Sequence, residues 1–189
     1  LQAIILDPPD HVITSNQDNY NCNIEGLLNE FFHTDFNRCY SAFKLLITNQ
    51  ASDISPVLLP LIDRAKLDYG ALYFFVHLFL TIDGWDYITL QKAKELCLYC
   101  LDENWPPSMK FRPAATLTLI KYEPSYLAKY FQSWMDEEFN PFWPSRYSCL
   151  LALDLFVDLS KAPEIFKALD TYSADSNRFV RLKIQDFLS

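Results

Sequence analysis

Glycine is scarce in this chain of 189 residues, which has only Gly26, Gly70 and Gly84. Hairpin turns and phosphate-binding loops use glycine because they need a positive φ or a close approach of the backbone to a ligand. The sequence therefore argues against a hairpin-rich sheet and against a phosphate-cradling loop. Eleven prolines separate the segments of the chain instead.

A long hydrophobic run is also missing. The longest one extends from Leu72 to Ile82 and includes His77. A membrane-spanning helix needs roughly 17 to 25 predominantly apolar residues, so this run is too short. We expect no transmembrane segment.

The five cysteines are odd in number, and most of them lie within apolar helical patterns. This pattern favours buried thiols in a reducing compartment and predicts a cytoplasmic protein. Cys97 and Cys100 have the spacing of a metal or redox pair, but no second such pair and no paired histidines occur. We therefore expect structural thiols, with no metal site and no cofactor.

Acidic residues outnumber basic ones by 24 to 16, which gives a formal net charge of −8. Nucleic-acid binding needs a basic field that neutralises phosphates, so a nucleic-acid partner is disfavoured. An acidic surface suits a soluble protein, or one whose protein partner is basic.

Half of the residues are hydrophobic, and from Ile24 onward they recur with the period of a helix. We expect ten helices: stripes at 27–32 and 40–47, then helices over 57–66, 69–82, 93–101, 113–122, 124–136, 144–159, 163–173 and 177–188. Ser55-Pro56 predicts a helix start, and Ser176 is the predicted cap of the last helix. The predicted fold class is all-α, with a single helical domain over residues 24–189 and an extended arm over residues 1–23.

An arginine recurs ahead of similar apolar helices, at Arg38, Arg112, Arg146 and Arg181. The last three are 34 and 35 residues apart, a period typical of stacked helix pairs. One unit departs from the pattern, because Asp68 stands where an arginine is expected. These arginines either tie adjacent repeats together through carboxylates or mark a functional surface.

The segment Phe179-Val180-Arg181, followed by the apolar residues Ile184 and Phe187, resembles the first helix of a HEAT repeat. The resemblance covers roughly residues 24–189. It implies a right-handed α-solenoid of about five helix pairs.

The segments 130–136, 142–151 and 177–188 are similar to the HEAT-like alkylpurine DNA glycosylases of bacteria. That family places a tryptophan four residues ahead of a catalytic aspartate. In this chain Trp85 is followed at that distance by Thr89, and Trp105 by Met109. The catalytic carboxylate is therefore missing, and we predict no catalytic residue from the resemblance.

His77 interrupts the most apolar helix of the chain. It could act as a base in a hydrophobic pocket. The other interpretation, which we favour, is a core histidine hydrogen-bonded to a backbone group.

A loop rich in aromatic residues and proline separates two repeats and lies beside an acidic cluster. This composition suits recognition of a partner, although packing between repeats is the interpretation we favour. The candidate partner-binding residues are Trp134, Asp136, Glu137, Glu138, Phe142, Trp143 and Arg146.

The leading hypothesis is a non-enzymatic scaffold that binds a protein, in one version an acidic inhibitor or immunity-type protein for a basic partner. The first alternative is a DNA-binding or DNA-repair protein of the HEAT-like glycosylase type. The second is a fragment of a larger HEAT-repeat scaffold, since the chain begins at Leu1 without a methionine and stops at Ser189 inside a repeat.

Overall fold

The computed structural model describes residues 24–102, 109–158 and 162–189. All regular elements within these ranges are helical, so the predicted all-α class is confirmed. The predicted arm over residues 1–23 lies outside the described residues. The elements are α2 (Ile24–Glu30), α3 (Phe36–Leu46), α4 (Ala51–Leu58), η1 (Leu59–Leu61), α5 (Ile62–Ala65), α6 (Tyr69–Thr81), α7 (Tyr87–Leu101), α8 (Arg112–Tyr122), α9 (Ser125–Met135), α10 (Trp143–Phe156), α11 (Pro163–Leu169), η3 (Asp170–Tyr172) and α12 (Arg178–Leu188).

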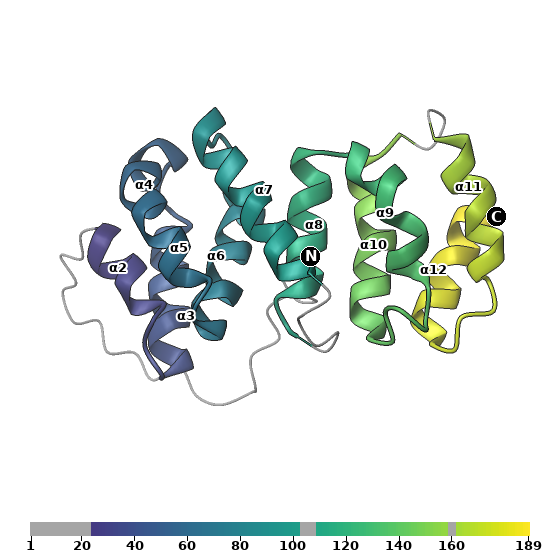
Figure 1. Ribbon diagram of the computed structural model, residues 1–189, viewed down its shortest axis with the longest axis horizontal. Coiled ribbons are helices and arrows are strands. Elements are labelled where there is room, and N and C mark those ends of the chain that lie inside the picture. The colour runs from purple at the N-terminus through teal and green to yellow at the C-terminus, as the bar shows by residue number, and fades with distance from the viewer. Residues whose placement is uncertain (1–23, 103–108, 159–161) are drawn as a thin grey trace.

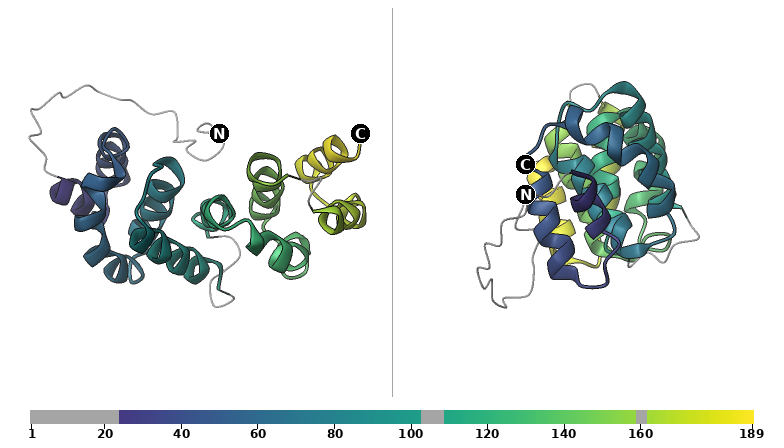
Figure 2. Two further views of the ribbon diagram at one scale, coloured as in Figure 1. Left: turned by 90° about the horizontal axis from the view of Figure 1, so that it is seen from above. Right: turned by 90° about the vertical axis from the view of Figure 1, so that its left-hand side faces the viewer.

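The helices form two rows along the long axis of the molecule (Figures 1 and 2). We call α3, α6, α8, α10 and α12 the inner row, and α4 with α5, α7, α9 and α11 the outer row. Neighbours in the inner row contact one another in chain order. The described residues thus form two rows of helices, and a right-handed solenoid of helix pairs stays a prediction.

Aspartate or asparagine is the N-cap residue of four described helices, α3, α6, α7 and α12. Asp35, Asp68 and Asp86 each accept a hydrogen bond from a backbone amide of the first turn, at 2.9 to 3.0 Å. Asn177 does the same for α12 and replaces the predicted cap Ser176. These side chains satisfy amides that have no partner within the helix.

The predicted helix start at Ser55-Pro56 is wrong. The helix α4 begins four residues earlier, at Ala51, and contains Pro56 in its interior. Ala51, Ile54 and Leu58 are buried on one face of α4. Their packing outweighs the cost of an interior proline, which is about 3 kcal/mol.

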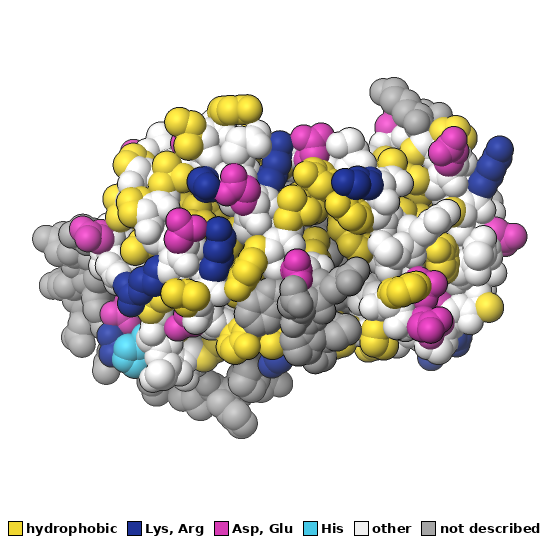
Figure 3. Space-filling model, viewed as in Figure 1, with side chains coloured by type: hydrophobic (Ala, Val, Ile, Leu, Met, Phe, Trp, Pro, Cys, Tyr) yellow, Lys and Arg dark blue, Asp and Glu magenta, His cyan; other side chains and the backbone are white. Residues whose placement is uncertain are grey.

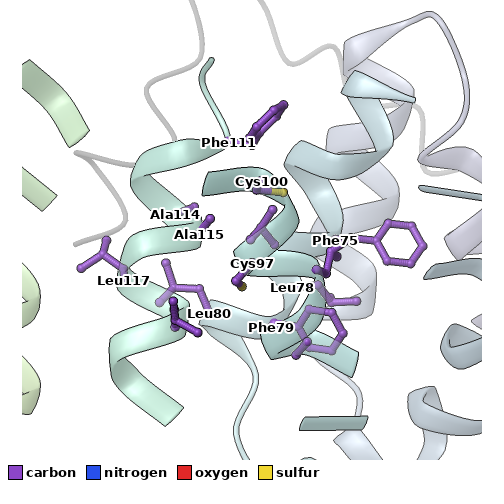
Figure 4. Packing of buried hydrophobic residues seen from close by; sticks show 14 of the residues in the cluster. Phe75, Leu78, Phe79, Leu80, Cys97, Cys100, Phe111, Ala114, Ala115 and Leu117 are labelled. Carbon is purple, nitrogen blue, oxygen red and sulfur yellow. The ribbon is translucent and has the colours of Figure 1, made fainter. Parts of the chain in front are cut away.

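The core lies between the two rows, where α6 and α8 are the most enclosed helices. Nine residues of α6, including the run from Phe74 to Leu80, are buried, and so are the seven residues from Ala114 to Ile120 of α8. Figure 4 shows Cys97 and Cys100 of α7 among the apolar side chains of these two helices. A single helix pair cannot bury such faces alone, so the repeats depend on their neighbours.

Each junction between a recurring arginine's helix and the segment before it is held by the side chain of that arginine. Arg38 pairs with both carboxylate oxygens of Glu30, at 2.7 and 2.9 Å. Arg112 donates to the carbonyl oxygens of Leu101 and Asp102, at 3.3 and 3.1 Å, and so caps the end of α7. The architectural interpretation of these residues is therefore supported at both sites.

Arg146 makes the most enclosed of these junctions. Its side chain is 1% exposed and forms two parallel hydrogen bonds with Asp175, at 2.7 and 2.9 Å. It also donates to the carbonyl oxygen of Asn140 at 2.6 Å. Arg181 binds the carbonyl oxygen of the same Asp175, so two helices of the inner row share one anchor.

Replacing Arg146 with alanine should lower the free energy of unfolding by about 3–5 kcal/mol, because the carboxylate of Asp175 would stay buried without its cation. Urea denaturation measures this loss. The control Arg178→Ala removes the same charge from an exposed position of α12 and should cost about 0.5 kcal/mol or less. Equal losses in the two variants would contradict the role of the junction.

Candidate functional site

A groove with a volume of about 880 Å³ runs along the inner row. Four helices contribute to it, namely α3, α6, α8 and α10. Its lining residues are Phe36, Asn37, Tyr69, Gly70, Tyr73, Phe74, His77, Met109, Lys110, Phe111, Pro113, Ala114, Leu117, Phe142, Trp143, Pro144, Tyr147, Ser148 and Leu151. Pockets that hold small ligands have about 300–1,000 Å³, so the groove can hold one organic molecule of substantial size.

Helical periodicity places these side chains in rows. Tyr69, Tyr73 and His77 are each four residues apart, so they form one stripe along α6. Tyr147 and Leu151 form the matching stripe along α10. The groove is therefore bounded by apolar and aromatic stripes from α6 and α10, with residues of α8 between them.

The groove has an unusual charge for an acidic protein. Among the described residues that line it, none is aspartate or glutamate, and Lys110 is the one lysine or arginine. The face shown in Figure 3 instead carries both acidic and basic side chains among apolar ones. Such a groove favours an apolar ligand that carries negative charge at one end.

His77 lies at the floor of the groove and is 2% exposed. Its Nδ1 is 2.6 Å from the carbonyl oxygen of Tyr73, and the two rings are 4.1 Å apart between centroids. The predicted core histidine bonded to the backbone is therefore confirmed. Burial disfavours the imidazolium and lowers the pKa of His77 to about 4, although the backbone hydrogen bond acts in the opposite direction.

The tautomer of His77 follows from this contact. A carbonyl oxygen only accepts hydrogen bonds, so the proton of the neutral ring lies on Nδ1. Nε2 is then the nitrogen with the lone pair. Burial also raises the pKa of Tyr73, which keeps its hydroxyl neutral at physiological pH.

Aromatic side chains continue beyond one end of the groove. Trp143 is 37% exposed and stacks on Phe179 of α12, with 5.5 Å between ring centroids. Phe179 is 56% exposed. We call Trp143 and Phe179 the aromatic edge.

The predicted partner-binding residues lie in three different environments. Phe142 and Trp143 line the groove, and Arg146 is enclosed in its ion pair with Asp175, so its guanidinium does not face solvent. The acidic residues order the loop itself, because Asp136 accepts from the amide of Glu138 at 2.8 Å. The role of the exposed members in binding a partner stays a prediction.

Two further predicted residues hold neighbouring segments in place. Glu137 accepts a hydrogen bond from the backbone amide of Ser176 at 2.6 Å, which links the loop to the start of α12. Trp134 stacks on Tyr130 with 5.4 Å between ring centroids, and its carbonyl oxygen accepts from the side chain of Asn140. Glu137 thus links the loop to α12, whereas the stack of Trp134 and Tyr130 lies within α9.

Sequence reasoning missed most of the groove. Tyr69, Tyr73 and Lys110 received no role, and for His77 a core position was favoured over a base in a hydrophobic pocket. The sequence feature that could have indicated the groove was in α6. This helix is apolar on the side that faces the groove as well as on the side that faces the core.

Cys97 and Cys100 lie in the core, away from the groove lining. Burial raises the pKa of Cys97 well above its ordinary value and that of Cys100 to about 12. Both thiols are therefore protonated at neutral pH, as expected of structural cysteines. Residues 24–102, 109–158 and 162–189 contain no group of three or more histidine, cysteine or acidic residues arranged for a metal ion.

Comparisons with known proteins found the following similarities. It is 32% identical over 163 residues to the bilin biosynthesis protein CpeY of Synechococcus sp. strain WH8020. It is 27% identical over 161 residues to the uncharacterized phycocyanin operon protein Y of Pseudanabaena tenuis strain PCC 7409. These matches cover 84% and 85% of this chain, but only 38% and 36% of the two relatives.

No family model matches the sequence. No solved structure matches it either. Within the part of the chain that the structure describes, all helices are too short or too polar to cross a bilayer.

The relatives correct the functional hypotheses drawn from the sequence. A scaffold, an acidic inhibitor and a DNA-repair protein are wrong, because both relatives are named for bilin biosynthesis or for a phycocyanin operon. The resemblance to DNA glycosylases is likewise unsupported.

The buried, neutral His77 should make the stability of the chain depend on pH. Its pKa is about 4 in the folded chain and about 6.5 in the unfolded chain, so the unfolded chain binds more protons between these values. The free energy of unfolding should therefore be highest above about pH 6.5 and should fall by about 3 kcal/mol as the pH drops to about 4.

Urea denaturation across this pH range measures the effect. His77→Gln should remove most of this dependence, whereas His33→Gln, at an exposed position, should retain it. An unchanged pH dependence in His77→Gln would show that other groups cause it.

Proposed function

We propose that this chain is part of a bilin biosynthesis protein and that the groove of its inner row binds the bilin. The observation that carries this proposal is the combination of aromatic stripes, a single lysine and no carboxylate among the described lining residues. The name of one relative, a bilin biosynthesis protein, supplies the class of ligand. The stack of helix pairs fits a HEAT-like repeat, which we include in the proposal.

The chemistry of a bilin matches this lining. A bilin is an open-chain tetrapyrrole, a flat conjugated molecule with apolar substituents, ring N–H groups and carboxylate side chains. Aromatic rings such as Tyr73, Tyr147 and Trp143 can stack on its faces, and each stacked pair contributes about 0.5–1.5 kcal/mol beyond its buried area. Apolar walls with few polar groups are typical of cofactor and ligand sites.

Lys110 provides the charge that a bilin carboxylate requires. It lies just ahead of α8 and lines the groove, whereas Lys129 of α9 lies in the outer row. The two lysines offer a matched pair for charge reversal. Both are exposed, so neither substitution disturbs the core.

Lys110→Glu should weaken the binding of biliverdin about tenfold or more, because a carboxylate would replace the cation that faces the ligand carboxylate. Lys129→Glu should bind biliverdin as the unaltered chain does. Absorbance titration of purified protein with biliverdin measures both affinities. Equal weakening in both variants would indicate an effect of net charge, and the absence of any binding would overturn the proposed function.

We further propose that the aromatic edge binds the protein to which the bilin is delivered, and that both proteins are cytoplasmic. This edge is exposed and continues one end of the groove through Trp143, so a bound protein would lie beside the bilin. Large aromatic residues are frequent anchors of protein interfaces. The phycocyanin operon of one relative makes apo-phycocyanin the partner to test.

Phe179→Ser should weaken binding to purified apo-phycocyanin about tenfold or more, since Phe179 is exposed and outside the groove lining. Tyr87→Ser removes a ring that is 75% exposed at the start of α7 and serves as the control. Surface plasmon resonance measures both affinities. Identical affinities of the two variants would contradict the role of the aromatic edge.

A further inference from the structure

The groove determines which protonation state of a bilin it can hold. Tyr69, Tyr73 and His77 of α6 line the groove, and so does Lys110, which lies just ahead of α8. From α10 the titratable residue is Tyr147, and α3 contributes Phe36 and Asn37. None of these residues is aspartate or glutamate, so the described lining offers no carboxylate to a cation.

A bilin gains a positive charge when its imine-type ring nitrogen is protonated. An apolar environment disfavours this charge unless an opposite charge lies nearby. The described lining residues include no aspartate or glutamate that could balance such a charge. Burial and the absence of a lining carboxylate therefore act in the same direction.

His77 supplies the complementary polar group. Its Nδ1 hydrogen bonds to the carbonyl oxygen of Tyr73, which leaves Nε2 as the acceptor nitrogen of a ring that lines the groove. The low pKa of His77 keeps this nitrogen unprotonated down to about pH 4. A ring N–H of a bilin is the kind of donor that such an acceptor binds.

We propose that the groove holds its bilin with a neutral tetrapyrrole, whose imine-type ring nitrogen is unprotonated. Nε2 of His77 accepts a hydrogen bond from a ring N–H. This inference rests on the proposed function. It makes His77 a positioning residue and gives the site a preference between two forms of the same ligand. By linkage, the bilin should be harder to protonate in the groove than in water.

The absorption spectrum of biliverdin tests the inference, because protonation shifts the long-wavelength band of a bilin to the red and strengthens it. The complex with the full chain should show the spectrum of neutral biliverdin at neutral pH. Acid titration of the complex should give an apparent pKa for the bound bilin at least one unit below that of free biliverdin. A pKa shift of one unit corresponds to a tenfold preference for the neutral form.

Two substitutions complete the test. His77→Phe keeps the site apolar and should weaken biliverdin binding about tenfold, while the spectrum stays that of the neutral form. Tyr69→Asp places a carboxylate at a lining position that is 59% exposed, so the fold should tolerate it, and it should raise the pKa of the bound bilin. The control Tyr87→Asp, outside the groove lining, should leave this pKa unchanged.

The outcomes separate this inference from the proposed function. If biliverdin does not bind at all, the proposed function fails. If it binds but shows the protonated spectrum at neutral pH, the proposed function stands and this inference is wrong. Unchanged binding by His77→Phe, with its helical content verified by circular dichroism, would remove the role of His77, and an unchanged pKa in Tyr69→Asp would contradict the electrostatic argument.

Discussion

The burial of apolar surface between successive helix pairs is the constraint on which the rest of the structure depends. Each pair leaves an apolar face that only its neighbour can cover. The helix α6 meets this constraint on one side, where its side chains pack into the core, and on its other side it faces the groove. The same stacking that stabilises the chain therefore aligns the stripes that line the groove.

The junctions between repeats fix this alignment. Arg146 and Asp175 form a buried, bidentate ion pair that holds α10 against the start of α12, and Trp143 stacks on Phe179 beside it. A buried pair of this kind gives geometric specificity more than net stability. Its position next to the groove connects the architecture of the repeat to the shape of the site.

The sequence predicted the helices and the junctions well, because both follow from local rules. Periodicity located the buried faces, and the spacing of Arg112, Arg146 and Arg181 indicated the repeat. The groove could not be predicted in the same way, since its residues come from four helices and meet only after the repeats stack. The net charge of −8 likewise does not describe the groove, whose described lining holds Lys110 and no carboxylate.

The ambiguity of His77 shows where sequence reasoning ends. A histidine within an apolar helix predicts burial and a backbone hydrogen bond, and both occur. Whether such a histidine also faces a ligand depends on the side chains of α8 and α10 opposite it, which no local pattern in α6 contains.

A crystal structure of this chain with bound biliverdin tests the central claim most directly. The account predicts that the bilin lies between α6, α8 and α10, with a carboxylate near Lys110 and a ring N–H near His77. A bilin bound to the outer row, or to the inner row without contact to either residue, would contradict it.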